Sequence, residues 1–185
     1  MFKLKSYTTQ ELLYISVLSA IGLAIKPIVT PLVHLVSTPL LLPGGSLAGG
    51  FYMMWLVLAA LLVRKFGSAF LTGFLQGIVV LSLGYFGNHG AISLVSYSLP
   101  GLAVDISAIV LTRKHIKQFC LFSAMLANLT GTVIVTFFVM RLPLLPFLIA
   151  LITSAVSGII GGLLSFKVFI GLKKYGIYIK EKIIS

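Results

Sequence analysis

The sequence is poor in acidic residues, and this scarcity excludes most kinds of catalysis. Three Asp and Glu residues occur among 185, namely Glu11, Asp105 and Glu181. So few carboxylates provide neither a pair for acid–base chemistry nor a cage for a hard cation. The phosphate-binding pattern G-x-x-x-x-G-K-[ST] is also absent from the sequence. We therefore expect no enzymatic activity, no catalytic residue, no cofactor and no ATP hydrolysis by this chain itself.

Cysteine and charge are scarce as well. The single cysteine, Cys120, excludes an internal disulfide and a cysteine-based metal site. His34 and His89 come from separate loops without an acidic partner, so we expect no metal site. Charged residues make up 9% of the sequence and hydrophobic residues 59%, whereas about a quarter of the residues in soluble domains are charged. The composition indicates an integral membrane protein.

The basic residues are sorted along the sequence. All of the 14 Lys and Arg except Lys26 and Arg141 fall in alternate joints between apolar runs or in the terminal segments. Membrane insertion leaves such residues preferentially in cytoplasmic joints. We therefore expect both termini in the cytoplasm, an even number of spans and a multi-pass protein of the cell membrane. The net charge of +11 lies in small groups at predicted helix ends, which is typical of membrane anchoring and not of nucleic-acid binding.

Apolar runs of about 20 residues are long enough to cross a bilayer as helices. The sequence predicts an all-α fold in one membrane domain, residues 1–185, in which the first apolar run is a retained helix and not a signal peptide. Its six transmembrane helices are expected at 10–29, 46–64, 67–86, 91–112, 119–140 and 144–170. Thr8 and Thr9 precede Gln10 and Glu11, which indicates a capped start of the first helix.

The segment 26–45 contains four prolines, Pro27, Pro31, Pro39 and Pro43. Prolines at this density oppose one uninterrupted helix. We expect a long first external loop or a re-entrant piece, since irregular backbone at membrane depth must face protein or a wet cavity. A loop of this length is usually functional, so the segment is expected to cap a binding pocket; the alternative is a simple connector.

Polar and aromatic residues gather on the predicted external side, which suggests a pocket that opens outward. The candidate ligand-binding residues are His34, Ser37, Tyr52, Tyr85, Asn88, His89 and Tyr97. Nearly uncharged surroundings suit a large neutral or weakly polar organic ligand. Glu11 and Glu181 are expected in solvent at the cytoplasmic ends. Asp105 lies inside a predicted span, where it either forms a structural contact with a basic residue or a helix terminus, or binds the ligand.

A stripe of small residues runs along the first predicted helix. Ser16, Ala20 and Ala24 recur at four-residue spacing, and such stripes let another helix approach closely in a bilayer. The stripe is expected to dock a partner protein or to pack internally within the bundle. Gly158, Gly161 and Gly162 form a less regular patch that is expected to be internal.

The segment from Gly49 to Asp105, with its Arg64-Lys65-Phe66-Gly67 turn, resembles the substrate-binding S-components of energy-coupling factor (ECF) vitamin importers. The similarity is to the branch that holds thiamine and hydroxymethylpyrimidine S-components and relatives once described as cobalt-transport permeases, which typically has Arg-Lys-Pro-Gly at this turn. The resemblance implies capture of an external vitamin under the first loop. It also implies docking of the first helix onto a transmembrane coupling subunit that is driven by two cytoplasmic ATPase subunits.

One departure from the family bears on the substrate. Members that handle cationic thiamine tend to carry acids in the third helix, where this chain has Thr72, Gly73, Phe74, Gln76 and Gly77. We therefore expect a larger neutral vitamin, cobalamin first, with thiamine or hydroxymethylpyrimidine as the alternative. A membrane scaffold without ligand is a competing prediction from the residues. A secondary transporter is disfavoured, since intramembrane ionisable groups are few and no internal repeat is evident.

Overall fold

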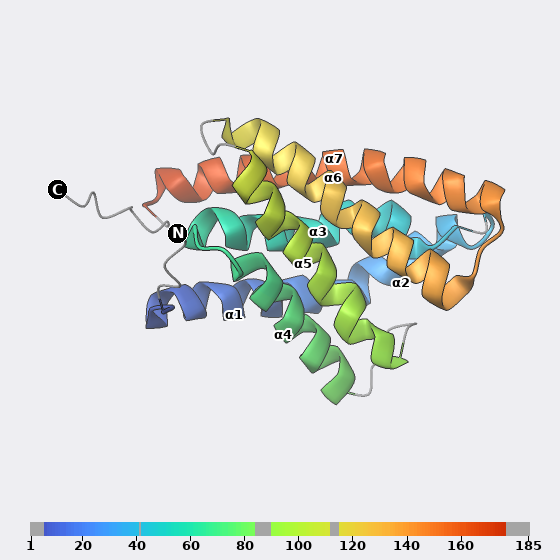
Figure 1. Cartoon of the computed structure of the whole chain (residues 1–185), viewed down its shortest axis with the longest axis horizontal. Coiled ribbons are helices and arrows are strands. Elements are labelled where there is room, and N and C mark those ends of the chain that lie inside the picture. Colours follow the sequence, from blue (N-terminus) through green and yellow to red (C-terminus); the bar gives the residue numbers. More distant parts are fainter. Residues whose placement is uncertain (1–5, 41, 84–89, 112–114, 177–185) are drawn as a thin grey trace.

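A computed structural model describes residues 6–40, 42–83, 90–111 and 115–176, and all regular secondary structure within these ranges is helical. The all-α class is therefore confirmed. The helices lie side by side in an elongated bundle (Figure 1). In chain order the elements are α1 (Thr9–Ala24), α2 (Lys26–Ser37), α3 (Gly44–Val63), α4 (Ser68–Ser82), η1 (Gly90–Ile92), α5 (Ser93–Val110), α6 (Ile116–Ile134), η2 (Val135–Met140) and α7 (Leu144–Lys174).

Helix length and composition make this a multi-pass membrane protein. Within the described ranges, α3, η1 with α5, α6 with η2, and α7 are each long and apolar enough to span a bilayer. A fifth span results if α1 and α2 count as one broken span, and α4 is apolar but has 15 residues. The count of six spans and their orientation in the membrane stay predictions.

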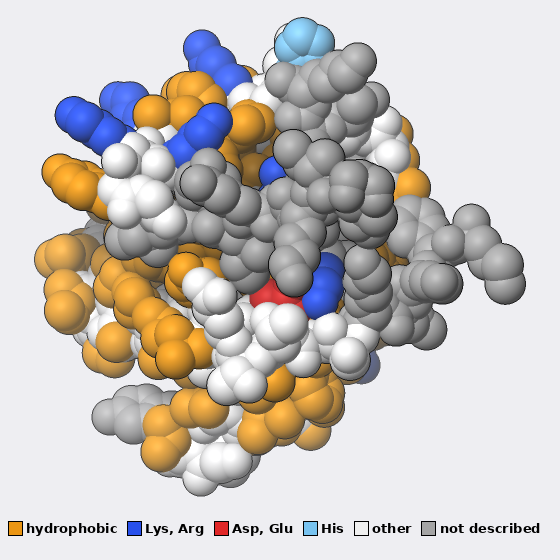
Figure 2. All heavy atoms as spheres, turned by 90° about the vertical axis from the view of Figure 1, so that its left-hand side faces the viewer, with side chains coloured by type: hydrophobic (Ala, Val, Ile, Leu, Met, Phe, Trp, Pro, Cys, Tyr) orange, Lys and Arg blue, Asp and Glu red, His pale blue; other side chains and the backbone are white. Residues whose placement is uncertain are grey.

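Both ends of the described chain lie at the same end of the bundle. The start of α1, the turn between α3 and α4, and the end of α7 meet there (Figure 1); we call this the termini end and the opposite one the far end. Lys117 lies in the first turn of α6, while Lys173 and Lys174 end α7. Figure 2 shows several basic side chains on this face, most of them along one edge and one beside an acidic side chain. Basic residues that are far apart in the sequence thus lie together at the termini end.

Of the two predictions for residues 26–45, the long external loop was wrong, whereas a re-entrant piece is compatible with the bent pair α1 and α2. Residues 26–37 form α2, and the non-helical connection to α3 shrinks to 38–43. Pro27 lies in the first turn of α2, where a helix does not need the backbone N–H that proline lacks. The predicted helix over 10–29 instead ends at Ala24, and α2 leaves it at an angle of 43°. The prolines therefore redirect the chain into a second helix and do not unwind it.

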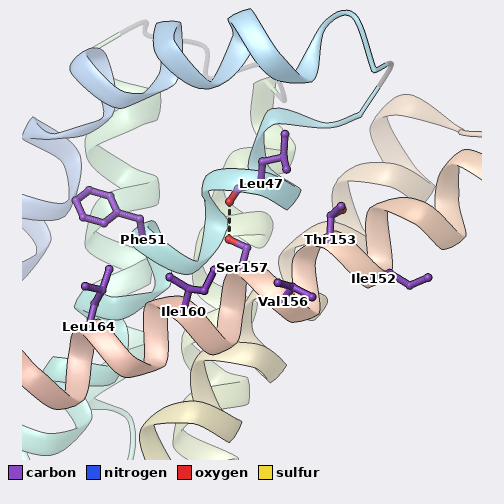
Figure 3. Close-up of a pocket in the computed structure, with 8 residues that line it drawn as sticks. All are labelled: Leu47, Phe51, Ile152, Thr153, Val156, Ser157, Ile160 and Leu164. Carbon is purple, nitrogen blue, oxygen red and sulfur yellow. Dashed lines mark hydrogen bonds between the residues drawn. The ribbon is translucent and has the colours of Figure 1, made fainter.

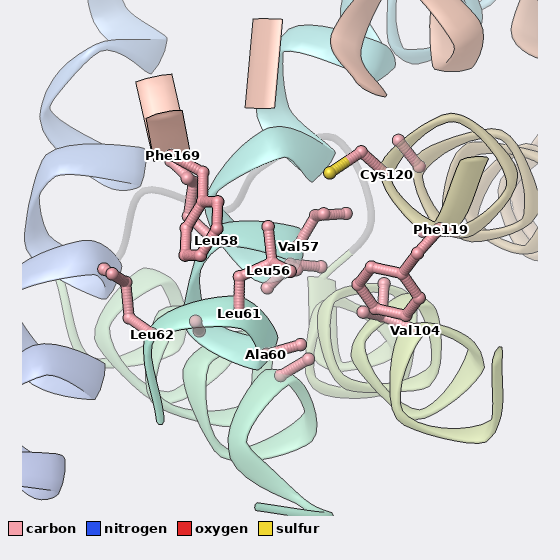
Figure 4. Packing of buried hydrophobic residues seen from close by; sticks show 14 of the residues in the cluster. Leu56, Val57, Leu58, Ala60, Leu61, Leu62, Val104, Phe119, Cys120 and Phe169 are labelled. Carbon is pink, nitrogen blue, oxygen red and sulfur yellow. The ribbon is translucent and has the colours of Figure 1, made fainter. Parts of the chain in front are cut away.

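Helix α3 is the centre of the bundle and contacts each of the other α helices. Its Val57 and Leu58 have no exposed surface, as expected for a helix that is hydrophobic on all sides. Val104 of α5 and Phe119 of α6 pack with it (Figure 4). This apolar core lies toward the termini end and fixes the helices there.

A network of polar contacts holds the N-terminal segment at the termini end. Thr8 and Glu11 form a reciprocal capping box. Glu11 also accepts a hydrogen bond from the Lys65 ammonium at 2.6 Å. The Tyr7 hydroxyl donates to the Phe66 carbonyl at 2.8 Å, and burial, assisted by the charges of Asp105 and Glu11, raises the pKa of Tyr7 to about 12. The capped start is confirmed, but Glu11 is 4% exposed and does not lie in solvent.

Candidate ligand-binding site

The structure brings two of the predicted ligand-binding residues together around Lys26, the first residue of α2. The Lys26 ammonium lies 3.7 Å from the ring centroid of Tyr97 on α5 and 5.0 Å from that of Tyr52 on α3. Aromatic faces attract a cation through their quadrupole, most strongly where water is excluded. Among the described residues, no carboxylate lies within ion-pair distance of Lys26.

Helix α2 turns a polar stripe toward α3. Lys26, Thr30 and His34 follow one another at four-residue spacing, and Thr30 and Tyr52 share a hydrogen bond at 3.0 Å. A side chain added at Gly44 would meet His34 at 3.3 Å and the Ser37 hydroxyl at 3.5 Å. His34 and Ser37 therefore pack at the far end of the stripe, against the start of α3. The opposite face of α2 is apolar and exposed through Ile28, Leu32, Leu35 and Val36.

Buried hydrogen-bond donors without protein partners lie on α3, α4 and α5. Trp55 Nε1, Gln76 Nε2 and the Ser93 hydroxyl are fully enclosed and unbonded in the described part of the chain. A Cβ atom at Gly22 would lie 2.5 Å from Gln76 Nε2 and 3.2 Å from Trp55 Cδ1, so both side chains meet at one place on α1, one helical turn before Lys26. Buried polar groups normally have partners, and such unpaired donors favour a site for an acceptor.

Helix periodicity places these donors with the aromatic pair. Trp55 is three residues beyond Tyr52 on α3, and Ser93 is four residues before Tyr97 on α5, spacings that share one helix face. We call Lys26, Tyr52, Trp55, Gln76, Ser93 and Tyr97 the Lys26 cluster. Of the remaining predicted ligand-binding residues, Tyr85, Asn88 and His89 lie outside the described residues.

Lys26, Trp55, Gln76 and Ser93 were not among the predicted ligand-binding residues. Lys26 was left for the side opposite the twelve other basic residues, and Gln76 was noted as part of a helix without acidic residues. The signal that could have found Lys26 is its position directly before Pro27, between two apolar segments. A lysine there has no neighbouring acid in sequence and begins a helix that proline separates from the previous one.

Asp105 has a structural role. Its carboxylate accepts hydrogen bonds from the backbone N–H groups of Ala69 at 3.3 Å and Phe70 at 2.8 Å, and the residue has no exposed surface. These amides belong to the first turn of α4, where a helix leaves its N–H groups unpaired and favours negative charge. Of the alternatives left open by the sequence, a structural contact with a helix terminus is present.

The small-residue stripe faces outward. Ser16, Ala20 and Ala24 are all exposed, whereas Ile15, Leu18 and Gly22 form the buried face of α1. Internal packing of the stripe within the bundle is thereby excluded. The glycine patch of α7 differs, because Gly158 and Gly162 pack against the backbone of α6 and Gly161 against that of Gly50. That patch is internal, as predicted.

Two apolar hollows open on the side of the bundle. One, of about 270 Å³, lies between α2 and α3, and another, of about 330 Å³, lies between α3 and α7 (Figure 3). Leu47 contributes to both hollows. None of the predicted ligand-binding residues that the structure describes lines either hollow, so the hollows are features of the apolar exterior. In the described part of the chain, no three His, Cys, Asp or Glu side chains come close enough to hold a metal ion.

Comparison with known proteins identifies the family. Residues 10–134 match the family model described as "ABC-type cobalt transport system, permease component". The chain belongs to this family. A solved structure described as "Crystal structure of an S-component of ECF transporter" has the same fold, with a TM-score of 0.77, 20% sequence identity, and coverage of 93% of this chain and 88% of that one. No curated protein matches the sequence.

Membership of this family makes the protein a component of a membrane transport system. The family model spans α1 to α6 and therefore includes every residue of the Lys26 cluster. The fold likeness extends over almost the whole chain, α7 included. Both findings are in line with the resemblance noted from the residues at 49–105.

Proposed function

We propose that the chain is the substrate-binding subunit, or S-component, of an ECF-type vitamin importer in the prokaryotic plasma membrane. The observation that carries the proposal is the family match combined with the S-component fold over 93% of the chain. The Lys26 cluster supplies a candidate place for a small molecule. The exposed stripe Ser16, Ala20 and Ala24 supplies a candidate surface for a partner helix.

In this proposal the vitamin enters from the external side at the far end of the bundle. The subunit then docks through α1 onto a transmembrane coupling subunit, and two cytoplasmic ATPase subunits supply the energy. Cobalamin is the first candidate from the sequence and thiamine or hydroxymethylpyrimidine the alternative. The unpaired ammonium of Lys26 disfavours a cationic ligand such as thiamine, because like charges repel in a low-dielectric interior.

The test is assembly and uptake by the full chain expressed with an ECF module. Ala20→Trp and Ala24→Trp fill the stripe with bulk and are expected to abolish co-purification and uptake, while ligand binding by the isolated subunit is unchanged. Ile106→Trp on α5 is the matched control, because Ile106 is 47% exposed and lies away from the stripe. Normal uptake by both stripe variants would refute docking through this surface, and failure of the native chain to join any ECF module would refute the proposed function.

A further inference from the structure

The donors of the Lys26 cluster have a common chemistry. The Trp55 ring N–H and the Lys26 ammonium only donate hydrogen bonds, and the unbonded atom of Gln76 is its amide nitrogen. The Ser93 hydroxyl can donate as well. A group of donors that includes one cation, with no carboxylate among the described residues at ion-pair distance from it, suits an acceptor that carries negative charge.

Burial makes these unpaired groups expensive unless something binds them. Gln76 is 4% exposed and Ser93 is not exposed at all. An enclosed polar atom without a partner costs about 1–3 kcal/mol, so the chain carries a cost here that an incoming acceptor would remove. Tyr52 and Tyr97 meanwhile hold the ammonium by its contact with their faces. The cation is therefore positioned before a ligand arrives.

We propose that the Lys26 cluster binds a small organic molecule through one anionic group, a carboxylate or a phosphate. Lys26 pairs with the charge, and Trp55, Gln76 and Ser93 donate hydrogen bonds to its oxygens. The rings of Tyr52 and Tyr97 cover the apolar or aromatic body of the molecule. This inference rests on the proposed function, since it specifies the substrate class for the same subunit, and it differs from the neutral vitamin expected from the sequence.

The test measures binding to the purified full chain in detergent, with probes that differ in the anionic group. The pairs are nicotinate with nicotinamide, biotin with biotinamide, and pantothenate with panthenol for a carboxylate, and pyridoxal 5′-phosphate with pyridoxal for a phosphate. At least one charged probe is expected to bind about 10- to 100-fold more tightly than its uncharged partner, because hydrogen bonds to charged groups are among the strong ones. The pair that shows this preference distinguishes the two anionic groups.

Three variants connect this preference with the cluster. Lys26→Gln is expected to weaken binding of the charged probe by about 10- to 100-fold and of its uncharged partner by less than about threefold. Lys26→Arg keeps the positive charge and is expected to keep the preference for the charged probe. Trp55→Phe keeps the ring but removes the donor, and is expected to weaken the charged probe by about tenfold. Lys117→Gln, an exposed cation at the other end of the bundle, is the matched control and leaves all affinities unchanged.

The outcomes that overturn the inference are distinct from those that overturn the proposed function. Binding of none of the charged probes, equal binding within every pair, or a preference that survives Lys26→Gln would each overturn the anionic site. Saturable binding of cobalamin or thiamine that Lys26→Gln does not alter would do so as well, while the S-component proposal stands. Size-exclusion profiles of Lys26→Gln and Lys26→Arg separate loss of the site from loss of the fold.

Discussion

The two ends of the bundle differ in whether every buried polar side chain has a hydrogen-bond partner. At the termini end, Asp105 accepts from two amides of α4, Glu11 pairs with Lys65, and the hydroxyls of Ser107 and Ser123 bond to each other. In the middle and at the far end some buried groups are paired, such as the Asn128 amide with the carbonyls of Ser46 and Ser154. Other enclosed polar atoms there have no partner within the described residues; they belong to Ser37, Trp55, Gln76, Ser93 and Thr132.

This difference assigns fold stability to the termini end and ligand binding to the region with unpaired groups. A satisfied buried network makes one arrangement of helices specific, and the termini end combines such contacts with the apolar core around Val57 and Phe119. A buried polar network with unpaired groups lowers stability, and natural proteins tolerate such a loss mainly at functional sites. The comparison predicts that substitutions at the termini end act on folding and that those at the far end act on ligand binding.

The largest effect is expected from Asp105. Asp105→Ala removes the acceptor of two buried amides of α4, and each buried donor left unpaired costs about 1–3 kcal/mol. We expect a loss of at least about 2–3 kcal/mol in the free energy of unfolding, measured by thermal and denaturant unfolding in detergent. Asp105→Asn keeps one acceptor and should lose less. An Asp105→Ala variant as stable as the native chain would contradict a structural role.

The ion pair between Glu11 and Lys65 should contribute less. The two side chains are 5% and 24% exposed, so solvent screens the pair in part. A double-mutant cycle with Glu11→Gln and Lys65→Gln is expected to give a coupling of about 1–2 kcal/mol in unfolding free energy. Neither variant should change ligand affinity, because both side chains lie at the termini end. A coupling near zero would show that the pair does not stabilise this end.

Two serines give a direct contrast between the ends. Ser93→Ala removes an unpaired hydroxyl at the far end, so the unliganded protein should keep its stability or gain up to about 1 kcal/mol, while ligand affinity falls. Ser123→Ala leaves the hydroxyl of Ser107 without its cross-helix partner at the termini end and should lose about 1 kcal/mol with unchanged affinity. Thermal unfolding with and without ligand measures both. The reverse pattern would contradict the division between the two ends.

The smallest effect concerns alkaline pH. The pKa of Tyr7 is raised in the folded protein from 10.0 to about 12, so the folded state binds this proton more tightly than the unfolded state. Its contribution to stability is therefore complete below pH 10 and is lost as the pH rises from about 10 to 12. Tyr7→Phe should remove this part of the pH dependence in unfolding experiments. The same alkaline slope in both proteins would assign it to other groups.

The composition and the length of the apolar runs were sufficient to predict the all-α fold class and the positions of α3, α5, α6 and α7 to within a few residues. The residues before the first run predicted the capped start of α1. These features follow from local rules on apolar length and helix ends. Helix α2 was not predicted because the argument used the number of prolines in the segment and not the position of each proline within a helix. Pro27 falls in a first turn, where proline is compatible with a helix.

The candidate site was only half predictable, since it depends on which helices meet. Tyr52 and Tyr97 were proposed because they belong to the polar and aromatic residues of the predicted external side, and the structure brings both to the same cation. Lys26 and Gln76 could not be joined to them from sequence, because their proximity arises from the break after Ala24 and the close approach at Gly22. Asp105 could not be assigned either, because its partners are backbone amides of another helix.

The central claim is that the unpaired groups toward the far end exist to bind a small molecule. Its most direct test is native mass spectrometry of the protein purified in mild detergent from cells grown in rich medium. We predict that the native chain and the Lys65→Gln control retain a small molecule of the same mass, and that the double variant Gln76→Met with Ser93→Ala is folded but empty. Equal occupancy in the double variant and the control, or no bound molecule in any of them, would contradict the claim.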